Sequence, residues 1–150
     1  TNNATQSAWG LSKKRKTNYK KPNETERTGL VVSRVGQGYY RQQIIEKWNG
    51  TCPITKSNLK SILISSHIVP WSKSNDDERL DVENGILLSP NIDSLFDKHL
   101  ISFEDDGSIL ISDKLDSLNR QSLNIDDSIK IPVSEGMKKY LKRHRVEFNK

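Results

Sequence analysis

The first regular pattern of apolar and polar positions lies in residues 37–48. Its apolar side chains recur three or four residues apart, as Tyr40, Ile44, Ile45 and Trp48. This spacing is typical of an amphipathic helix, and Asn49-Gly50 predicts its C-terminal end. We expect folded structure to begin just before this helix, near residues 30–32.

Two short apolar runs follow, at residues 62–68 and 86–88. Both are rich in Ile and Leu and are flanked by turn-forming residues, so both are predicted as strands. Pro70 ends the first of them. The segment between them, residues 72–83, is polar and without periodicity, and it is predicted as a loop.

Helices and a hairpin are predicted after the second run. Ser89-Pro90 has the composition of a helix start, with Ser89 as the cap, and this helix is expected to end near His99. Asp106-Gly107 lies between two further apolar runs and predicts a hairpin. A last helix, with His144 on its apolar face, is predicted over residues 134–148. Residues 113–128 give no clear pattern, and the order of elements indicates an α+β fold.

Composition narrows the class of protein. The chain has 150 residues, 33% of them hydrophobic, which is enough for one modest core. Its net charge of +5 favours a polyanionic partner. The single cysteine, Cys52, excludes an intrachain disulfide and a cysteine-based zinc finger, and we expect it to be buried. No apolar run approaches the roughly 18 residues of a membrane span and no signal peptide is visible, so a cytoplasmic location is expected.

Residues 1–28 differ from the rest of the chain. They are rich in Asn, Thr, Ser and Lys, and include the run Lys13-Lys14-Arg15-Lys16. This composition is typical of a solvated linker, and it also suits a basic arm that follows phosphates. We therefore divide the chain into a basic flexible linker or arm, 1–28, and a folded domain, 29–150. The absence of an initial methionine suggests a fragment of a longer chain.

Four polar residues stand at informative positions around the two strands. His67 ends the first run, Asn84 precedes the second, and Asp93 and Asp97 follow four residues apart. A neutral imidazole can take a proton from water near pH 7. Two residues four apart share one face of a helix, so the two carboxylates can hold one cation. Asn84 is expected to fix the loop through side-chain hydrogen bonds to the backbone.

The order of these residues resembles the HNH endonucleases, whose site is the ββα-metal motif. The lead-in from Arg34 to Arg41 and the segment Leu95-Phe96-Asp97 resemble one bacterial restriction or defence branch of that family. The resemblance implies His67 as general base, Asn84 as the loop-holding amide, and Asp93 and Asp97 as metal ligands. It implies a ββα-metal core with an N-terminal helix, a following β-hairpin and a C-terminal helix.

Two differences from the family pattern affect the expected metal. Ser66 stands where many members have a ligating Asp or His, and aspartates stand where many have helical histidines. The oxygen-rich site favours Mg²⁺ or Mn²⁺ over Zn²⁺. The cysteine quartet that holds structural zinc in many relatives is missing, so no structural zinc is expected.

The substrate implied by the resemblance is DNA, cleaved at a phosphodiester bond. Five basic residues are candidate phosphate contacts: Arg41, Lys98, Lys138, Lys139 and Lys142. An additional recognition domain in a longer chain is expected, and no membrane partner. Two alternatives stay open, an RNA-cleaving nuclease or toxin with the same site and a catalytically inactive DNA-binding module. Trp71 suits packing or base stacking, and the oligomeric state does not follow from the sequence.

Overall fold

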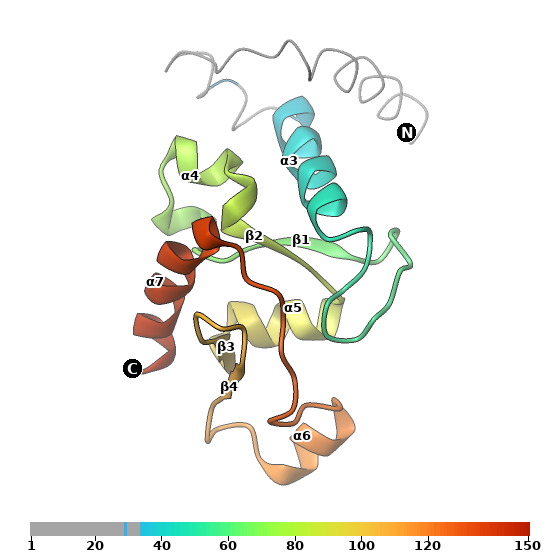
Figure 1. The fold of residues 1–150 in the computed structure, drawn as a ribbon, viewed down its shortest axis with the longest axis vertical. Helices are drawn as coiled ribbons and strands as arrows, with labels where there is room; N and C mark the ends of the chain where they lie inside the picture. The colour runs from blue at the N-terminus through green and yellow to red at the C-terminus, as the bar shows by residue number, and fades with distance from the viewer. Residues whose placement is uncertain (1–28, 30–33) are drawn as a thin grey trace.

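The computed structural model describes residue 29 and residues 34–150 (Figure 1). The predicted arm, residues 1–28, and the predicted start of folded structure, residues 30–32, lie outside this part. The fold is α+β, as predicted. Its helices are α3 (Arg34–Lys47), α4 (Asp76–Leu80), α5 (Pro90–Asp97), α6 (Ser117–Ser122) and α7 (Lys138–Phe148), its 3-10 turns are η2 (Trp71–Lys73), η3 (Val82–Asn84) and η4 (Glu135–Met137), and its strands are β1 (Ile64–His67), β2 (Gly85–Leu88), β3 (Ile101–Phe103) and β4 (Ile109–Ile111).

The centre of the fold is the antiparallel pair β1–β2, in which His67 lies opposite Gly85. Helices α3 and α4 lie on one side of this pair and α5 lies on the other (Figure 1). All four residues of β2 are buried because both of its faces are covered. The close approach of α3 requires glycine at position 85, since a Cβ there would lie 2.2 Å from Tyr40 Oη.

A second antiparallel pair, β3–β4, follows α5, and Ile101 lies opposite Ile111. The hairpin predicted at Asp106-Gly107 is confirmed. Gly107 has a φ of +90°, and a Cβ there would collide with the backbone oxygen of Ile131. Glycine is therefore required at position 107, both for the positive φ and for the close approach of Ile131. Beside this turn, Ser108 and Lys130 form an isolated antiparallel bridge.

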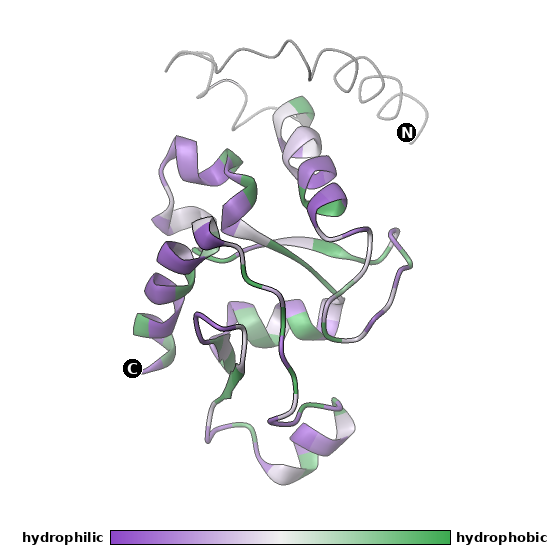
Figure 2. Cartoon of the chain, in the orientation of Figure 1, coloured by the Kyte–Doolittle hydropathy of each residue, from purple (hydrophilic) through white to green (hydrophobic). Residues whose placement is uncertain are grey.

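The core joins the apolar faces of α3, α5 and α7 around β2. The predicted residues Tyr40 and Ile44 on α3 are buried, and so is Trp48, which directly follows the helix. Cys52 and His144 are buried, as predicted. Figure 2 shows the apolar colour concentrated on the strands and on the inward sides of these helices. No helix in the described part of the chain is long and apolar enough to cross a membrane.

The loop predicted over residues 72–83 is wrong, because this segment contains η2, α4 and most of η3. Helix α4 has no buried residue, so it lacks the apolar face on which the prediction depended. A capping box stabilises it instead: the Asn75 side chain accepts from the Glu78 backbone N–H, and the Glu78 side chain accepts from the Asn75 backbone N–H.

Other element boundaries differ more modestly from the prediction. Helix α3 begins three residues earlier than expected, and β1 is shorter than residues 62–68. Ser89 occupies the N-cap position of α5, but its hydroxyl bonds to Thr55 Oγ at 2.5 Å and not to the helix backbone. The last helix begins at Lys138, after η4. Residues 113–128 contain α6, which the Asp116 side chain caps.

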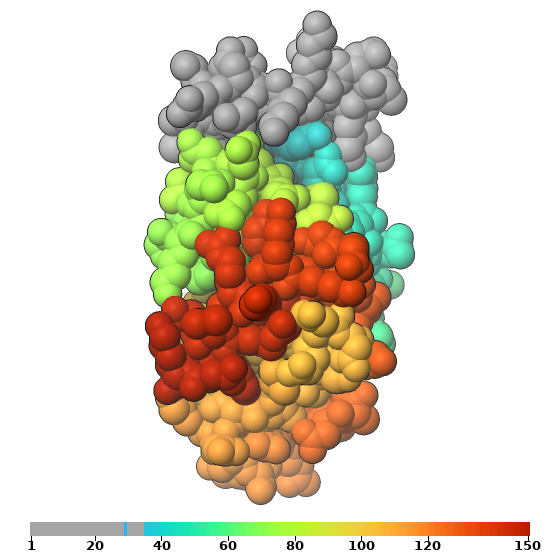
Figure 3. Space-filling view, turned by 60° about the vertical axis from the view of Figure 1, so that its left-hand side comes forward, coloured from blue at the N-terminus to red at the C-terminus, as the bar shows by residue number. Residues whose placement is uncertain are grey.

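Helix α7 connects the α4 region with the segment after β3. In Figure 3 it lies between the α4 region and the β3–β4 segment. Arg143 pairs with Glu78 at 2.5 Å, and Arg145 pairs with Asp105 at 2.9 Å. Two of its basic side chains are therefore engaged in holding the fold together.

Candidate active site

His67 ends β1, and its imidazole is fixed by a hydrogen bond to the loop that follows. Nε2 lies 2.8 Å from the backbone oxygen of Arg79. Because a carbonyl oxygen only accepts, Nε2 must carry the proton and donate. In the neutral ring the lone pair is then on Nδ1, to which the described residues make no hydrogen bond. This tautomer leaves Nδ1 able to accept a proton.

Two aromatic rings hold the imidazole in place. Tyr40 stacks on His67 with ring centres 4.3 Å apart and planes 6° apart, and Trp71 meets it edge-on at 5.8 Å. Burial lowers the pKa of His67, the bond to the Arg79 carbonyl raises it, and the Arg79 guanidinium lowers it. The net shift of the pKa is downward, so the His67 imidazole is neutral at pH 7.

Asn84 is fully buried and binds the loop that carries Arg79. Its Oδ1 accepts from the Val69 N–H at 2.9 Å, and its Nδ2 donates to the Glu78 carbonyl at 3.0 Å. A longer contact of 3.4 Å reaches Ser74 Oγ. These bonds connect the end of β1 with α4, and they therefore fix the carbonyl that orients His67.

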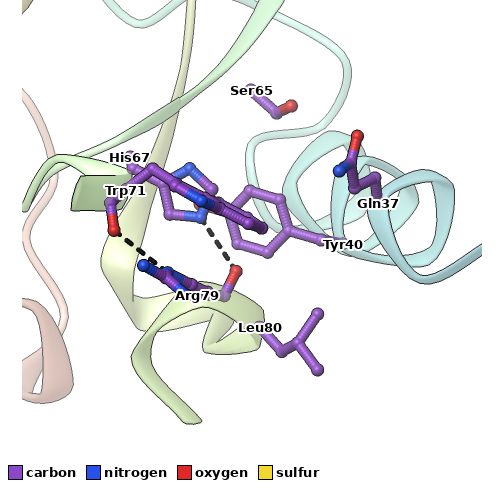
Figure 4. A pocket seen from close by; sticks show the side chains of 7 residues that line it. All are labelled: Gln37, Tyr40, Ser65, His67, Trp71, Arg79 and Leu80. Carbon is purple, nitrogen blue, oxygen red and sulfur yellow. Dashed lines mark hydrogen bonds between the residues drawn. The ribbon is translucent and has the colours of Figure 1, made fainter. Parts of the chain in front are cut away.

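A pocket of about 350 Å³ opens beside the imidazole (Figure 4). Its walls come from α3, β1, η2 and α4, and its lining residues are Gln37, Tyr40, Ser65, His67, Trp71, Arg79 and Leu80. The Arg79 guanidinium lies 4.6 Å from the Trp71 ring centre, and its Nε donates to the Trp71 carbonyl at 3.0 Å. The pocket thus combines a base, a cation and an aromatic surface.

The acidic pair lies on the other side of β1. Successive residues of a strand point to opposite faces, so Ser66 faces α5 while Ser65 and His67 face α3 and α4. The Ser66 hydroxyl forms a hydrogen bond with the Asp93 carboxylate. Burial raises the pKa of Asp93, the Ser66 bond lowers it, and the negative charge of Asp97 raises it; the net shift is upward.

These donors suit one kind of metal ion. Two carboxylates and a hydroxyl provide hard oxygen ligands, and Mg²⁺ is often held by one or two carboxylates while keeping several waters. A cation would also relieve the repulsion between Asp93 and Asp97. In the part of the chain that the structure describes, no group of three His, Cys, Asp or Glu side chains could hold a metal. The preference for Mg²⁺ or Mn²⁺ over Zn²⁺ stays a prediction.

The predicted phosphate contacts lie in different environments. Arg41 donates to the backbone oxygens of Leu63 at 2.7 Å and Lys60 at 2.8 Å, so its guanidinium holds the segment before β1. Lys98 is exposed at the end of α5. On α7, Lys138 pairs with Glu135.

The remaining two α7 lysines are less engaged. Lys139 lies 5.0 Å from the ring centre of Tyr140, and Lys142 is exposed. A phosphate-binding role for the basic residues of α7 stays a prediction.

The other two histidines form a separate buried cluster. His99, at a φ of +58° just after α5, stacks on His144 with ring centres 4.3 Å apart. His144 bonds through Nε2 to the Phe96 carbonyl and through Nδ1 to the Ser102 hydroxyl. Burial lowers the pKa of His144 to about 4. This cluster packs α7 against α5 and β3.

Of the seven residues that line the pocket, only His67 was predicted as a site residue, and the three that contact its ring were not. Tyr40 was predicted as a core residue, and Arg79 was placed in a predicted loop. For Trp71, both packing in the core and stacking on a base were left open. The sequence contains one signal for Arg79: the pattern Asn75-x-x-Glu78 predicts a helix start, which would have placed Arg79 in an ordered element.

The β1–β2–α5 unit has a histidine at the end of its first strand and an acidic pair on its helix. A family model described as HNH endonuclease matches residues 52–104. The matched segment includes His67, Asn84, Asp93 and Asp97, and it supports the resemblance found in the sequence. A search of the curated proteins found no match.

Proposed function

We propose that this chain is an endonuclease that hydrolyses phosphodiester bonds of DNA, with His67 as the general base and a divalent cation held by Asp93 and Asp97. The observation that carries this proposal is the His67 imidazole. Its Nε2 donates to the Arg79 carbonyl, and its ring lines an open pocket. The family match over residues 52–104 supports nuclease chemistry at this position.

The base step follows from the state of the ring. Neutral His67 accepts a proton at Nδ1 from a water whose oxygen bonds to phosphorus, and the Arg79 carbonyl stabilises the resulting imidazolium. The bond between phosphorus and the 3′-oxygen breaks, the 3′-oxygen takes a proton from solvent, and the phosphate stays on the 5′ side. Tyr40 covers one face of the ring and limits its rotation. Asn84 contributes indirectly, because its bonds to Val69 and Glu78 fix the loop that presents the carbonyl.

The proposal also requires groups that neutralise the negative charge of the phosphodiester. Ser66 and His67 are neighbours, with Cα atoms about 3.8 Å apart. One phosphodiester at the end of β1 can therefore meet groups from both faces of the strand. A cation bound by Asp93 and Asp97 would neutralise charge on the phosphate oxygens. Arg79 is a positive group of the pocket beside His67, and its charge attracts a phosphate to that side.

The test is a cleavage assay with supercoiled plasmid, single-stranded DNA and RNA, in Mg²⁺, Mn²⁺ or EDTA. We expect DNA cleavage that EDTA abolishes, and a decrease of about 10²- to 10⁴-fold in His67→Ala. His99→Asn is the matched control, since asparagine tolerates the positive φ at that position. Equal cleavage by His67→Ala would refute the base assignment.

The same assay distinguishes the alternatives. Cleavage of RNA alone would replace DNA as the substrate. Metal-independent binding without cleavage of any substrate would identify a non-catalytic nucleic-acid-binding module. The latter outcome has a structural basis, because Ser66 supplies a hydroxyl where many HNH proteins have a stronger metal ligand.

A further inference from the structure

The pocket beside His67 has an aromatic wall that the hydrolysis itself does not require. Trp71 is 38% exposed, and it is the only exposed aromatic side chain among the described residues. The other described tryptophan, Trp48, is buried and donates from Nε1 to the Gly85 carbonyl. Trp71 therefore leaves apolar surface in water at the edge of the reacting centre.

This exposed indole is held in a fixed orientation. The Arg79 guanidinium lies over the Trp71 ring, and Arg79 Nε donates a hydrogen bond to the Trp71 backbone oxygen. The indole ring is nearly perpendicular to the His67 ring. Figure 4 shows the indole drawn between Arg79 and the part of the pocket where Ser65 lies. A planar surface fixed before binding loses little side-chain entropy when a ligand covers it.

We infer that the pocket beside His67 holds an unpaired nucleobase next to the phosphate that is cleaved, with the indole of Trp71 as its stacking platform. This inference rests on the proposed function and specifies its substrate. The pocket volume of about 350 Å³ is at the small end for ligand sites, which begin at roughly 300 Å³. That size suits one nucleotide, and it is too small for a paired duplex step.

The chemistry of the walls favours a base over a phosphate alone. The single cationic side chain of the pocket, Arg79, is already shared with Asp76 at 3.4 Å and with the Trp71 carbonyl. Aromatic rings stack on any nucleobase, because each base has a π-face. A base inside a duplex has both faces covered by its neighbours, so only a single-stranded or flipped nucleotide can stack on Trp71.

The inference is tested by binding in EDTA, which separates it from cleavage. Short single-stranded oligonucleotides are titrated into the full chain, and tryptophan fluorescence and oligonucleotide anisotropy are recorded. We expect quenching that disappears in Trp71→Phe although Trp9 and Trp48 remain. Affinity should decrease by about 5- to 150-fold in Trp71→Ala, and by less in Trp71→Phe.

An abasic oligonucleotide separates stacking from a merely structural role of Trp71. If the base stacks on the indole, removing bases should weaken binding to the wild type, and Trp71→Ala should then cause no further loss. Equal losses on intact and abasic strands would overturn the inference, as would equal quenching by a fully paired duplex. Leu118→Ala, at an exposed apolar position far along the chain, is the control and should bind as the wild type does.

The outcomes also separate this inference from the proposed function. Cleavage with no effect of Trp71 substitutions would leave the nuclease proposal intact and refute the stacking platform. Quenching and base-dependent binding without cleavage would support the platform and refute the catalytic proposal. Thermal melting of each variant checks that it is folded under the conditions of the assay.

Discussion

Replacing Asn84 by alanine should destabilise the fold and free the loop that orients His67. The change removes the acceptor of the Val69 N–H, a group on a residue that is only 3% exposed. A buried donor without a partner costs about 1–3 kcal/mol. The Glu78 carbonyl also loses its donor, but Glu78 is half-buried and water can replace the lost bond. We therefore expect a decrease of about 2–4 kcal/mol in the free energy of unfolding.

Urea and thermal unfolding measure this change, and a decrease of roughly 10 °C in Tm is expected for a domain of this size. Asn58→Ala is the control, because Asn58 is exposed and a surface substitution changes stability by about 0.5 kcal/mol or less. The His67 pKa, followed by NMR, should rise toward its ordinary value of about 6.5 as the ring becomes more hydrated.

The reasoning would be refuted if Asn84→Ala unfolded at the same urea concentration as Asn58→Ala. It would also be refuted if the variant lost stability while His67 titrated as in the wild type. In the second case Asn84 would stabilise the core without fixing the loop that holds the imidazole.

Three further predictions concern pH, metal and salt. Burial lowers the pKa of His144 to about 4, so the folded state resists protonation of this imidazole. The free energy of unfolding should therefore be highest above about pH 6.5 and decrease by up to about 3 kcal/mol as the pH falls toward 4. His144→Gln should reduce this pH dependence, as measured by urea titrations at several pH values. Mg²⁺ should raise the Tm of the wild type but not of the Asp93→Asn, Asp97→Asn double variant. The charge-matched control is the double variant Asp113→Asn, Asp127→Asn, at two exposed positions. An unchanged shift in the Asp93, Asp97 variant would exclude the acidic pair. Deleting residues 1–21 removes six basic residues, and it should flatten the dependence of log affinity on log salt if the arm binds phosphates; an unchanged slope would make it a tether.

The elements that the sequence predicted correctly are those whose hydrophobic pattern also determines their packing. Tyr40 and Ile44 of helix α3, and Trp48 directly after it, are buried as their spacing predicts. The β3–β4 hairpin follows from its Asp-Gly turn. Helix α4 was not predicted because it has no buried residue and is stabilised by the capping box of Asn75 and Glu78 at its N-terminus. Hydrophobic periodicity carries no information about such a helix.

The candidate site was predictable only where chemistry depends on spacing along the chain. His67 and Asn84 stand at the ends of predicted strands, and their neighbourhood follows from the antiparallel pairing. The approach of Arg79 and Trp71 to His67 depends on how η2 and α4 fold back, which no local pattern specifies. For Arg41, the sequence suggested a phosphate contact but could not show that its guanidinium donates to the carbonyls of Lys60 and Leu63.

The alternation of Ser66 and His67 along β1 makes the two halves of the site independently adjustable. A change at position 66 alters the donors offered toward α5 and leaves the aromatic and basic walls of the pocket untouched. A change at Trp71 or Arg79 does the reverse. If the proposed roles of the two faces hold, metal preference and substrate preference can change separately in this scaffold. A one-residue insertion or deletion in β1 would exchange the two faces and disrupt both together.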